Sequence, residues 1–421
     1  MALRPSRSAS PPRRVGAAAA TVLALLLAGG CQASTSSTPS ARSGAAAATG
    51  STPEASSGSS TSRSAAHAGP AHVSVSPSSA SAHVQPDTTV AVRVRSGKLT
   101  SVTVLDARGG TISGGRSAGG TTWKAVSLLR PQTAYTVTVK AVGADGAAVT
   151  KVARFTTLTP KVSATYSLSP TGTVGVGMPV VVRFDSPVSS EDRAQVEKRV
   201  AVRTSPAQAG AWGWQDSSQL VWRPATYWKA GTTVAVSAAI QGVRTGKGKY
   251  VAKSDTSSFT VGDSMVSTVD IKTHMMTVKR NGTSVRTIPV STGRPGATTE
   301  TRSGTKVIMT REPVHVMDSG SIGIPKGTPG YYHVVAKWAM RITSTGEFLH
   351  SAPWSVSAQG HTNVSHGCTN LSPTNAKWLY DHSRLGDVVT FTGSSRRFTA
   401  DEGIGVWTYS YSDWKARSAL A

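Results

Sequence analysis

Apolar and polar residues alternate in short runs from about residue 72 onward, and Gly-rich turns separate the runs. Alternation with a period of two is typical of strands that bury one face. The clearest runs in the first stretch are Val90–Val94, Val102–Val104 and Tyr135–Val139. After Pro160 the pattern begins again, with Val180–Phe184 and Thr232–Val236. The chain is therefore expected to be mainly β, with two successive β-sandwiches at residues 72–160 and 161–262.

Both sandwiches carry a spacing that is typical of the immunoglobulin-like type. Leu129–Tyr135 resembles a tyrosine corner, in which the phenol bonds back to upstream backbone. Trp222–Tyr227 repeats this spacing in the second sandwich.

A third β-rich unit is expected at residues 263–393. Asn281-Gly282 between alternating runs is a strong hairpin signal. Ser372-Pro373 predicts the start of one short helix and Gly386 its end. Further strands are expected at Val307–Thr310, Trp338–Ile342, Phe348–His350 and Val388–Phe391. Residues 394–421 contain several aromatic residues, so we expect this C-terminal tail to pack on the third unit: Trp407, Tyr409, Tyr411 and Trp414.

The first 71 residues differ from the rest of the chain. Residues 1–30 have a basic start, an apolar stretch and small residues before Cys31, as in a secretory signal peptide. The run Leu27–Cys31 resembles a bacterial lipobox, which implies that Cys31 carries a lipid and anchors the chain to a membrane; a plain cleaved signal is the alternative. Residues 31–71 are rich in Ser, Thr, Ala and Gly and predict a disordered linker spanning roughly 35 Å.

The chain has two cysteines, Cys31 and Cys368. If Cys31 is lipidated, Cys368 has no partner, and an exported protein with one free thiol is expected to use it, unless the thiol is merely structural. The formal net charge is +24. An exported protein rarely meets nucleic acid, so we expect no nucleic-acid partner; anionic lipids or wall polymers are the alternative partners, and a generally basic composition explains the charge equally well.

A cluster of candidate catalytic residues lies between His350 and Asn370. Ser365-His366-Gly367-Cys368 places a thiol beside a glycine, and His350 lies eighteen residues before it. Acyl transfer by a thiol needs a base and donors for the oxyanion, which these residues offer. The spacing lacks the paired ligands of a zinc site, so neither a metal nor a cofactor is expected.

His350 and the run Ser365–Asn370 resemble the signature of the L,D-transpeptidase catalytic domain, the YkuD fold. The wider stretch from Met317-Asp318-Ser319 to the aromatic tail is similar to L,D-transpeptidases with two immunoglobulin-like domains. The resemblance implies a monomeric, exported lipoprotein at the outer face of the cytoplasmic membrane. It would act on peptidoglycan stem peptides, release D-Ala from tetrapeptides and form 3→3 cross-links.

The resemblance also implies roles for individual residues. Cys368 is the nucleophile and His350 the base, oriented by the main-chain carbonyl of Ser351. His366, Gly367 and Cys368 would supply backbone donors to the oxyanion. The residues expected to contact substrate are Met317, Tyr332, Thr345, Gly346, Asn370 and Trp354, with packing beneath the site favoured for Trp354. Ile322 stands where related lids often have Tyr.

Other functions are left open by the sequence. Water could replace the acceptor amine, which would make the protein an L,D-carboxypeptidase, or the chain could be an inactive wall-binding lipoprotein. The sandwiches show no cluster of convergent polar groups, which favours rigid spacers over wall binding or substrate gating.

Overall fold

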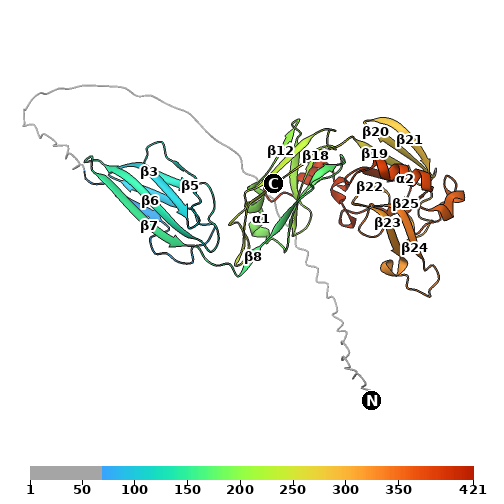
Figure 1. Ribbon diagram of the computed structural model, residues 1–421, viewed down its shortest axis with the longest axis horizontal. Helices are drawn as coiled ribbons and strands as arrows, with labels where there is room; N and C mark the ends of the chain where they lie inside the picture. The colour runs from blue at the N-terminus through green and yellow to red at the C-terminus, as the bar shows by residue number, and fades with distance from the viewer. Residues whose placement is uncertain (1–68) are drawn as a thin grey trace, which may run out of the picture. The chain divides into compact units, whose positions relative to one another are not determined.

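The computed structural model of the protein describes residues 69–421. The predicted signal peptide, the lipidation of Cys31 and nearly all of the predicted linker fall outside these residues. The described part is mainly β, as predicted (Figure 1). No helix within residues 69–421 is long and apolar enough to cross a membrane.

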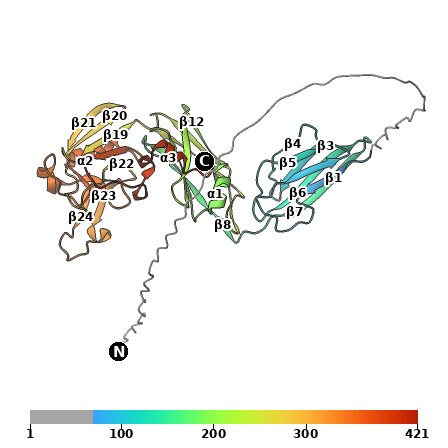
Figure 2. The same ribbon diagram turned by 180° about the vertical axis from the view of Figure 1, so that it is seen from behind.

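The first sandwich consists of two antiparallel sheets, with strand orders β1-β2-β5-β4 and β3-β6-β7 (Figure 2). Its core between the sheets includes Trp123, Leu129 and Phe155. The strands are β1 (His72–Ser76), β2 (Ala91–Arg95), β3 (Gly97–Asp106), β4 (Gly114–Arg116), β5 (Thr122–Ala125), β6 (Ala134–Gly143) and β7 (Ala148–Thr156).

The tyrosine corner of the first sandwich is confirmed. The Tyr135 hydroxyl accepts a hydrogen bond of 2.6 Å from the backbone N–H of Arg130. The corner predicted in the second sandwich does not form, because the Tyr227 hydroxyl has no hydrogen bond to upstream backbone within residues 69–421. Burial raises the pKa of Tyr227, and the two threonine side chains that oppose this rise, Thr305 and Thr390, belong to the third unit. A spacing argument cannot anticipate a partner that lies in another domain.

The second sandwich has two four-stranded sheets, β10-β18-β15-β12 and β13-β14-β11-β9, and a small sheet β16-β17-β8. Its core contains Phe184, Trp214, Trp222 and Phe259. A helix that the sequence did not predict, α1 (Ser190–Glu197), follows β11. The strands are β8 (Val162–Ala164), β9 (Tyr166–Ser169), β10 (Gly172–Val174), β11 (Val180–Phe184), β12 (Val200–Ser205), β13 (Gly210–Trp214), β14 (Gln219–Pro224), β15 (Thr233–Ala238), β16 (Arg244–Gly246), β17 (Lys249–Val251) and β18 (Asp255–Val261).

The third unit pairs a five-stranded sheet, β21-β20-β19-β27-β22, with a four-stranded sheet, β23-β24-β25-β26. Its core includes Met276, Ile288, Met340 and Phe391. The strands are β19 (Met265–Asp270), β20 (Met275–Arg280), β21 (Thr283–Pro289), β22 (Gly304–Val307), β23 (Thr310–Asp318), β24 (His333–Arg341), β25 (Phe348–Ser351), β26 (Thr369–Leu371) and β27 (Val388–Thr392). The helices are η1 (Ser319–Ile322), η2 (Pro353–Ala358) and α2 (Pro373–His382).

The Asn281-Gly282 hairpin is confirmed, with φ angles of 49° and 85° that suit a type I′ turn. The strand predicted at Val307–Thr310 is wrong: β22 ends at Val307 and β23 begins at Thr310, because the chain crosses there between the two sheets. Helix α2 starts where predicted, and the Ser372 hydroxyl accepts from the Asn375 N–H at 3.3 Å.

Helix α2 ends at His382 and not at Gly386. Gly386 instead occupies a later turn, with φ 95°, where its carbonyl accepts from the N–H of Gly177 in the second sandwich.

The C-terminal tail contacts two domains rather than the third unit alone. Its first part, through η3 (Ala400–Glu402), joins the third unit by an ion pair between Glu402 and Arg302. The next segment, η4 (Gly405–Thr408), contacts both β22 of the third unit and the second sandwich. The last helix, α3 (Tyr411–Lys415), packs on the second sandwich: Trp414 is fully buried and its Nε1 donates to the Ala211 carbonyl at 3.1 Å. Gly213 makes room for this ring, since a Cβ there would come within 2.9 Å of it. The prediction that the whole tail packs on the third unit is therefore wrong for its last part.

Candidate active site

Two parallel strands bring the candidate nucleophile and base together. β25 and β26 are paired in a register that sets His350 opposite Asn370. Cys368 directly precedes β26 and packs with Met317 and Phe348. The parallel pairing therefore brings His350 and Cys368 to the same cavity, although they are eighteen residues apart in the sequence.

Cys368 borders two cavities, and most of the predicted site residues line one or both. A cavity of 290 Å³ contains His350 and is lined by Met317, Tyr332, Val334, His350, Trp354, Val364, Ser365, His366, Cys368 and Asn370. A more polar cavity of 770 Å³ shares Met317, Tyr332, His366 and Cys368 with the first. Thr345 and Gly346 line the second cavity, together with Arg302, Arg341 and Arg396.

The imidazole of His350 is held in one tautomer. Its Nδ1 lies 2.9 Å from the main-chain carbonyl oxygen of Ser351, as the sequence predicted. A carbonyl only accepts, so Nδ1 carries the proton and Nε2 keeps its lone pair. His350 is buried, and burial lowers its pKa to about 4 against the smaller opposing effect of the Ser351 hydrogen bond. The ring is thus a neutral base at physiological pH.

The Cys368 thiol is protonated in this arrangement. Its Sγ donates to the Gly346 carbonyl at 3.6 Å. Although the side chain keeps partial exposure to the cavities, dense protein surroundings raise the pKa of the thiol to about 12, with burial as the main cause. The Glu347 carboxylate raises this pKa further, whereas Arg341 and Lys306 lower it. The resting pair is a neutral thiol and a neutral imidazole.

Ser365, for which no separate role was predicted, fixes the loop before Cys368. The Ser365 hydroxyl donates to the Cys368 carbonyl at 2.6 Å and accepts from the Gly367 N–H at 3.1 Å. On the other side, the buried Thr301 donates to the Gly367 carbonyl at 2.8 Å. Ser365 stands in the motif, but no local pattern could reveal Thr301, which lies 66 residues from Gly367 in sequence.

The predicted set of oxyanion donors changes as a result. The Gly367 N–H already donates to Ser365, so it is not free for a substrate oxygen. Within residues 69–421, the amides of His366 and Cys368 have no hydrogen-bond partner. These two amides remain as candidate donors.

Trp354 and Asn370 are placed differently from what the sequence predicted. Trp354 was expected to pack beneath the site, but its side chain is 54% exposed and its ring centroid lies 6.0 Å from that of His350 at the cavity wall. Asn370 is buried, and its amide donates to the Ser355 hydroxyl of η2 at 2.9 Å. Asn370 therefore anchors the helix that carries Trp354.

Tyr332 and His366 both line the two cavities. Their rings lie 5.1 Å apart, and burial raises the pKa of Tyr332 to about 12. His366 Nε2 is buried and has no partner among the described residues. Residue Ile322 ends η1, and the structure does not describe its side chain, so the prediction of an altered lid stays a prediction.

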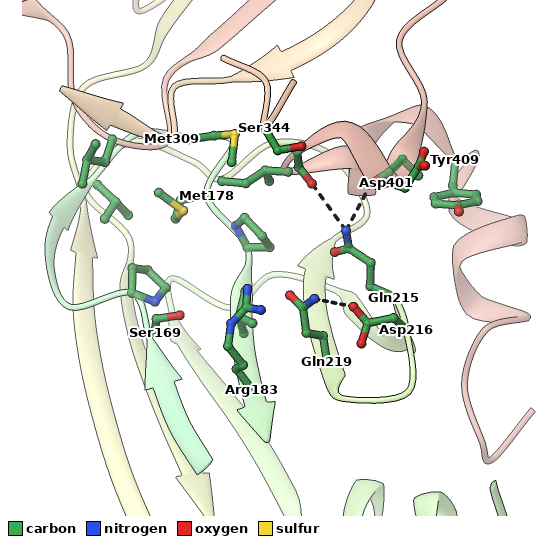
Figure 3. A pocket seen from close by; sticks show the side chains of 18 of the residues that line it. Ser169, Met178, Arg183, Gln215, Asp216, Gln219, Met309, Ser344, Asp401 and Tyr409 are labelled. Atoms are coloured by element: carbon green, nitrogen blue, oxygen red, sulfur yellow. Dashed lines mark hydrogen bonds between the residues drawn. The ribbon is translucent and has the colours of Figure 1, made fainter. Parts of the chain in front are cut away.

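A separate cavity of 980 Å³ lies between the second sandwich and the third unit. Figure 3 shows Gln215 reaching across it, with its amide donating to the carbonyls of Ala400 and Gly403 at 3.2 and 3.4 Å. Arg183 and Asp216 also line this cavity. It contains none of the predicted catalytic or substrate residues, so we place the candidate active site at Cys368.

Comparisons with known proteins cover the unit that contains this site. Residues 264–391 match the family model of the L,D-transpeptidase catalytic domain, and residues 81–244 match a bacterial Ig domain. L,D-transpeptidase 2 of Mycobacterium tuberculosis is 36% identical over 337 residues, which cover 80% of this chain and 82% of that protein. The chain belongs to the L,D-transpeptidase family. L,D-transpeptidase 5 of the same organism is 34% identical and covers 82% of this chain and 76% of that protein.

A solved structure of an L,D-transpeptidase in complex with imipenem is 38% identical, with a TM-score of 0.47, and covers 55% of this chain and all of that one. The match to the bacterial Ig domain spans parts of both sandwiches. The match to the L,D-transpeptidase catalytic domain covers the unit that contains His350 and Cys368.

Proposed function

We propose that this member of the L,D-transpeptidase family forms 3→3 cross-links in peptidoglycan through an acyl-enzyme on Cys368. One observation carries the proposal: His350 and Cys368 line the same cavity, and the Ser351 carbonyl leaves Nε2 of His350 as a neutral base. The donor is a tetrapeptide stem, and the bond that breaks joins its diaminopimelate to the terminal D-Ala.

The first half-reaction begins from the neutral pair. As the sulfur attacks the donor carbonyl, the thiol proton passes to Nε2 of His350, because a thiol with a pKa of about 12 cannot ionise by itself near neutral pH. The negative charge that develops on the carbonyl oxygen is stabilised by the amides of Cys368 and His366. His350 then returns the proton to the leaving nitrogen, and D-Ala departs.

The second half-reaction uses the neighbouring cavity. Since two cavities meet at Cys368, an acyl group held in one leaves the thioester accessible from the other. The side-chain amine of a diaminopimelate on a second stem attacks the thioester carbonyl, and Nε2 of His350 accepts the amine proton. The C–S bond then breaks, and His350 passes this proton to the departing Cys368 sulfur, which restores the neutral thiol and imidazole. Arg341 and Arg396 in the polar cavity suit the carboxylates of a stem peptide.

The test is incubation of the purified protein with disaccharide-tetrapeptide, followed by mass spectrometry. Dimers that have lost one D-Ala are expected. Shortened monomers alone would indicate that water is the acceptor and the protein a carboxypeptidase. The absence of any product, together with no carbapenem adduct on Cys368, would refute both activities, and dimers formed by Cys368→Ala would refute the nucleophile.

We also propose that the protein is exported and held at the outer face of the membrane through a lipid on Cys31, with the sandwiches as spacers. The lipobox-like run before Cys31 supports this proposal. Radiolabelled palmitate should enter the wild type and not Cys31→Ser; equal labelling of both forms would contradict the anchor.

A further inference from the structure

A chain of four alternating charges lies next to Gly346, whose carbonyl accepts the Cys368 thiol. Nζ of Lys306 on β22 is 2.5 Å from Glu347 Oε2. Nη1 of Arg302 is 2.9 Å from Glu347 Oε1, and its Nε is 2.6 Å from Oε1 of Glu402 on η3. The side chains are 0, 4, 11 and 15% exposed for Lys306, Glu347, Arg302 and Glu402. We call Lys306–Glu347–Arg302–Glu402 the charge chain.

Stability alone does not account for this arrangement. A fully buried lysine is rare unless it is paired, and a buried ion pair can often be replaced by apolar residues without loss of stability. The charge chain contains two cations and two anions, so its net charge is zero only when Glu402 of the C-terminal tail is included. A third unit without the tail would leave one buried positive charge unbalanced.

The charge chain is joined to both segments that hold Cys368. Glu347 directly follows Gly346, whose carbonyl accepts the Cys368 thiol. The Arg302 N–H also donates to Glu347 Oε1 at 3.1 Å. Thr301, the residue before Arg302, donates to the carbonyl of Gly367. The dipeptide Thr301-Arg302 thus fixes the nucleophile relative to its hydrogen-bond acceptor.

We propose that the charge chain is a positioning element that keeps the resting Cys368 thiol protonated on the Gly346 carbonyl, and that Glu402 of the tail completes it. The proposal rests on the proposed function only in taking Cys368 as the nucleophile. Because the thiolate is the reactive form, a balanced charge chain delays ionisation until His350 accepts the proton during attack.

Several other ionisable groups face Cys368 and must stay constant in a test. Arg341 on β24 acts on the thiol through its charge. His350, His366 and Tyr332 line the cavity beside it. The variants below change none of these groups.

The experiment measures alkylation of Cys368 by iodoacetamide in the full chain between pH 6.5 and 9. Mass spectrometry of the Cys368 peptide separates its reaction from that of Cys31. Glu402→Gln leaves one excess positive charge, and Lys306→Met leaves one excess negative charge. Asp401→Asn is the matched control, because it removes a neighbouring carboxylate on η3 that bonds to Thr399 and not to the charge chain.

At a fixed pH, Glu402→Gln should be alkylated faster and Lys306→Met more slowly, by about tenfold for each unit by which the thiol pKa moves. The double variant, with one cation and one anion remaining, should return close to the wild-type rate. Asp401→Asn should match the wild type.

Equal rates in wild type and Glu402→Gln, or rates that change in the same direction in both single variants, would overturn the proposal. If Lys306→Met does not fold, by circular dichroism, the faster alkylation of Glu402→Gln still decides it. Cross-linking assays of the same proteins are scored separately. If Cys368→Ala still made cross-links, the proposed function would be wrong. The alkylation rates would still show whether the charge chain keeps the Cys368 thiol protonated.

Discussion

Asp387 is a buried carboxyl group whose ionisation destabilises the folded state. The residue is 2% exposed and lies just before β27. Its Oδ2 accepts from the Arg384 N–H at 2.7 Å, whereas its Oδ1 is buried without a partner among residues 69–421. Burial raises the pKa of this carboxyl from 3.8 to about 7, against the lowering effects of Arg384 and Arg311. We predict that Asp387→Asn stabilises the protein at and above neutral pH.

The size of the effect follows from proton linkage. A rise from 3.8 to about 7 is roughly three pKa units, and each unit corresponds to about 1.4 kcal/mol. The folded state binds this proton more tightly than the unfolded state. Protonation of Asp387 therefore stabilises the folded state fully below pH 3.8, and this stabilisation is lost as the pH rises through 7. Asn cannot ionise, so the variant should gain about 4 kcal/mol over wild type by pH 8 and little near pH 4.

The pH profile of the wild type alone would not reveal this effect, because His350 acts in the opposite direction. Burial lowers the pKa of His350 from 6.5 to about 4, so the folded state binds this proton less tightly than the unfolded state. The resulting contribution is present above pH 6.5 and is lost as the pH falls through 4. It is common to wild type and variant, and it cancels in their difference.

The assay is urea unfolding of both proteins from pH 4 to pH 8, followed by tryptophan fluorescence. The expected result is a difference in the free energy of unfolding that grows with pH over this range. Asp381 forms an exposed ion pair with Lys377 and offers the control Asp381→Asn. This substitution should change the free energy of unfolding by no more than about 0.5 kcal/mol. A difference between Asp387→Asn and wild type that is the same at every pH would refute the reasoning.

Three further predictions concern the tail, the loop before Cys368 and His350. Trp414→Ala should lower the free energy of unfolding by about 3–5 kcal/mol, because a fully buried ring leaves a cavity; a loss below about 1 kcal/mol in urea would show that the tail is held elsewhere. Ser365→Ala removes the bonds to the Cys368 carbonyl and the Gly367 N–H, and should slow carbapenem acylation of Cys368 by about tenfold; Ser418→Ala, a distant serine bonded to Glu197, should leave that rate unchanged. Since the pKa of His350 is lowered to about 4, the acid limb of the profile of kcat/KM for cross-linking should lie near pH 4, and a limb near 6.5 would contradict a buried neutral base.

Much of the fold could be predicted because its signals are local. Alternating runs predicted strands such as β11 and β27, and Asn281-Gly282 predicted a hairpin by requiring positive φ at both residues. Predictions failed where a distant partner decides the outcome. Burial raises the pKa of Tyr227 against the lowering effects of Thr305 and Thr390 of the third unit, and Trp414 of the tail is buried against the second sandwich. The sequence around Tyr227 and around the tail contains no signal of these distant partners.

The candidate site divides in the same way. A short motif and its resemblance to a family sufficed to name Cys368, His350 and the carbonyl of Ser351. Thr301 and the charge chain could not be found in this way, because they come from four segments that only the two packed sheets and η3 bring together. The occupied amide of Gly367 shows the limit of motif-based roles: a residue can be in the expected place while its hydrogen bond is already used.

The division of the tail between two domains determines where the protein can be shortened for crystallisation or inhibitor screening. Nε1 of Trp407 donates to the Gly177 carbonyl at 2.7 Å, and the Arg417 guanidinium donates to the carbonyls of Trp214 and Gln215. A fragment that begins at residue 263 would lack the second sandwich. The rings of Trp407 and Trp414 would then be exposed to water, which favours aggregation. The smallest well-behaved fragment should begin near residue 161, and affinity tags belong at its N-terminus.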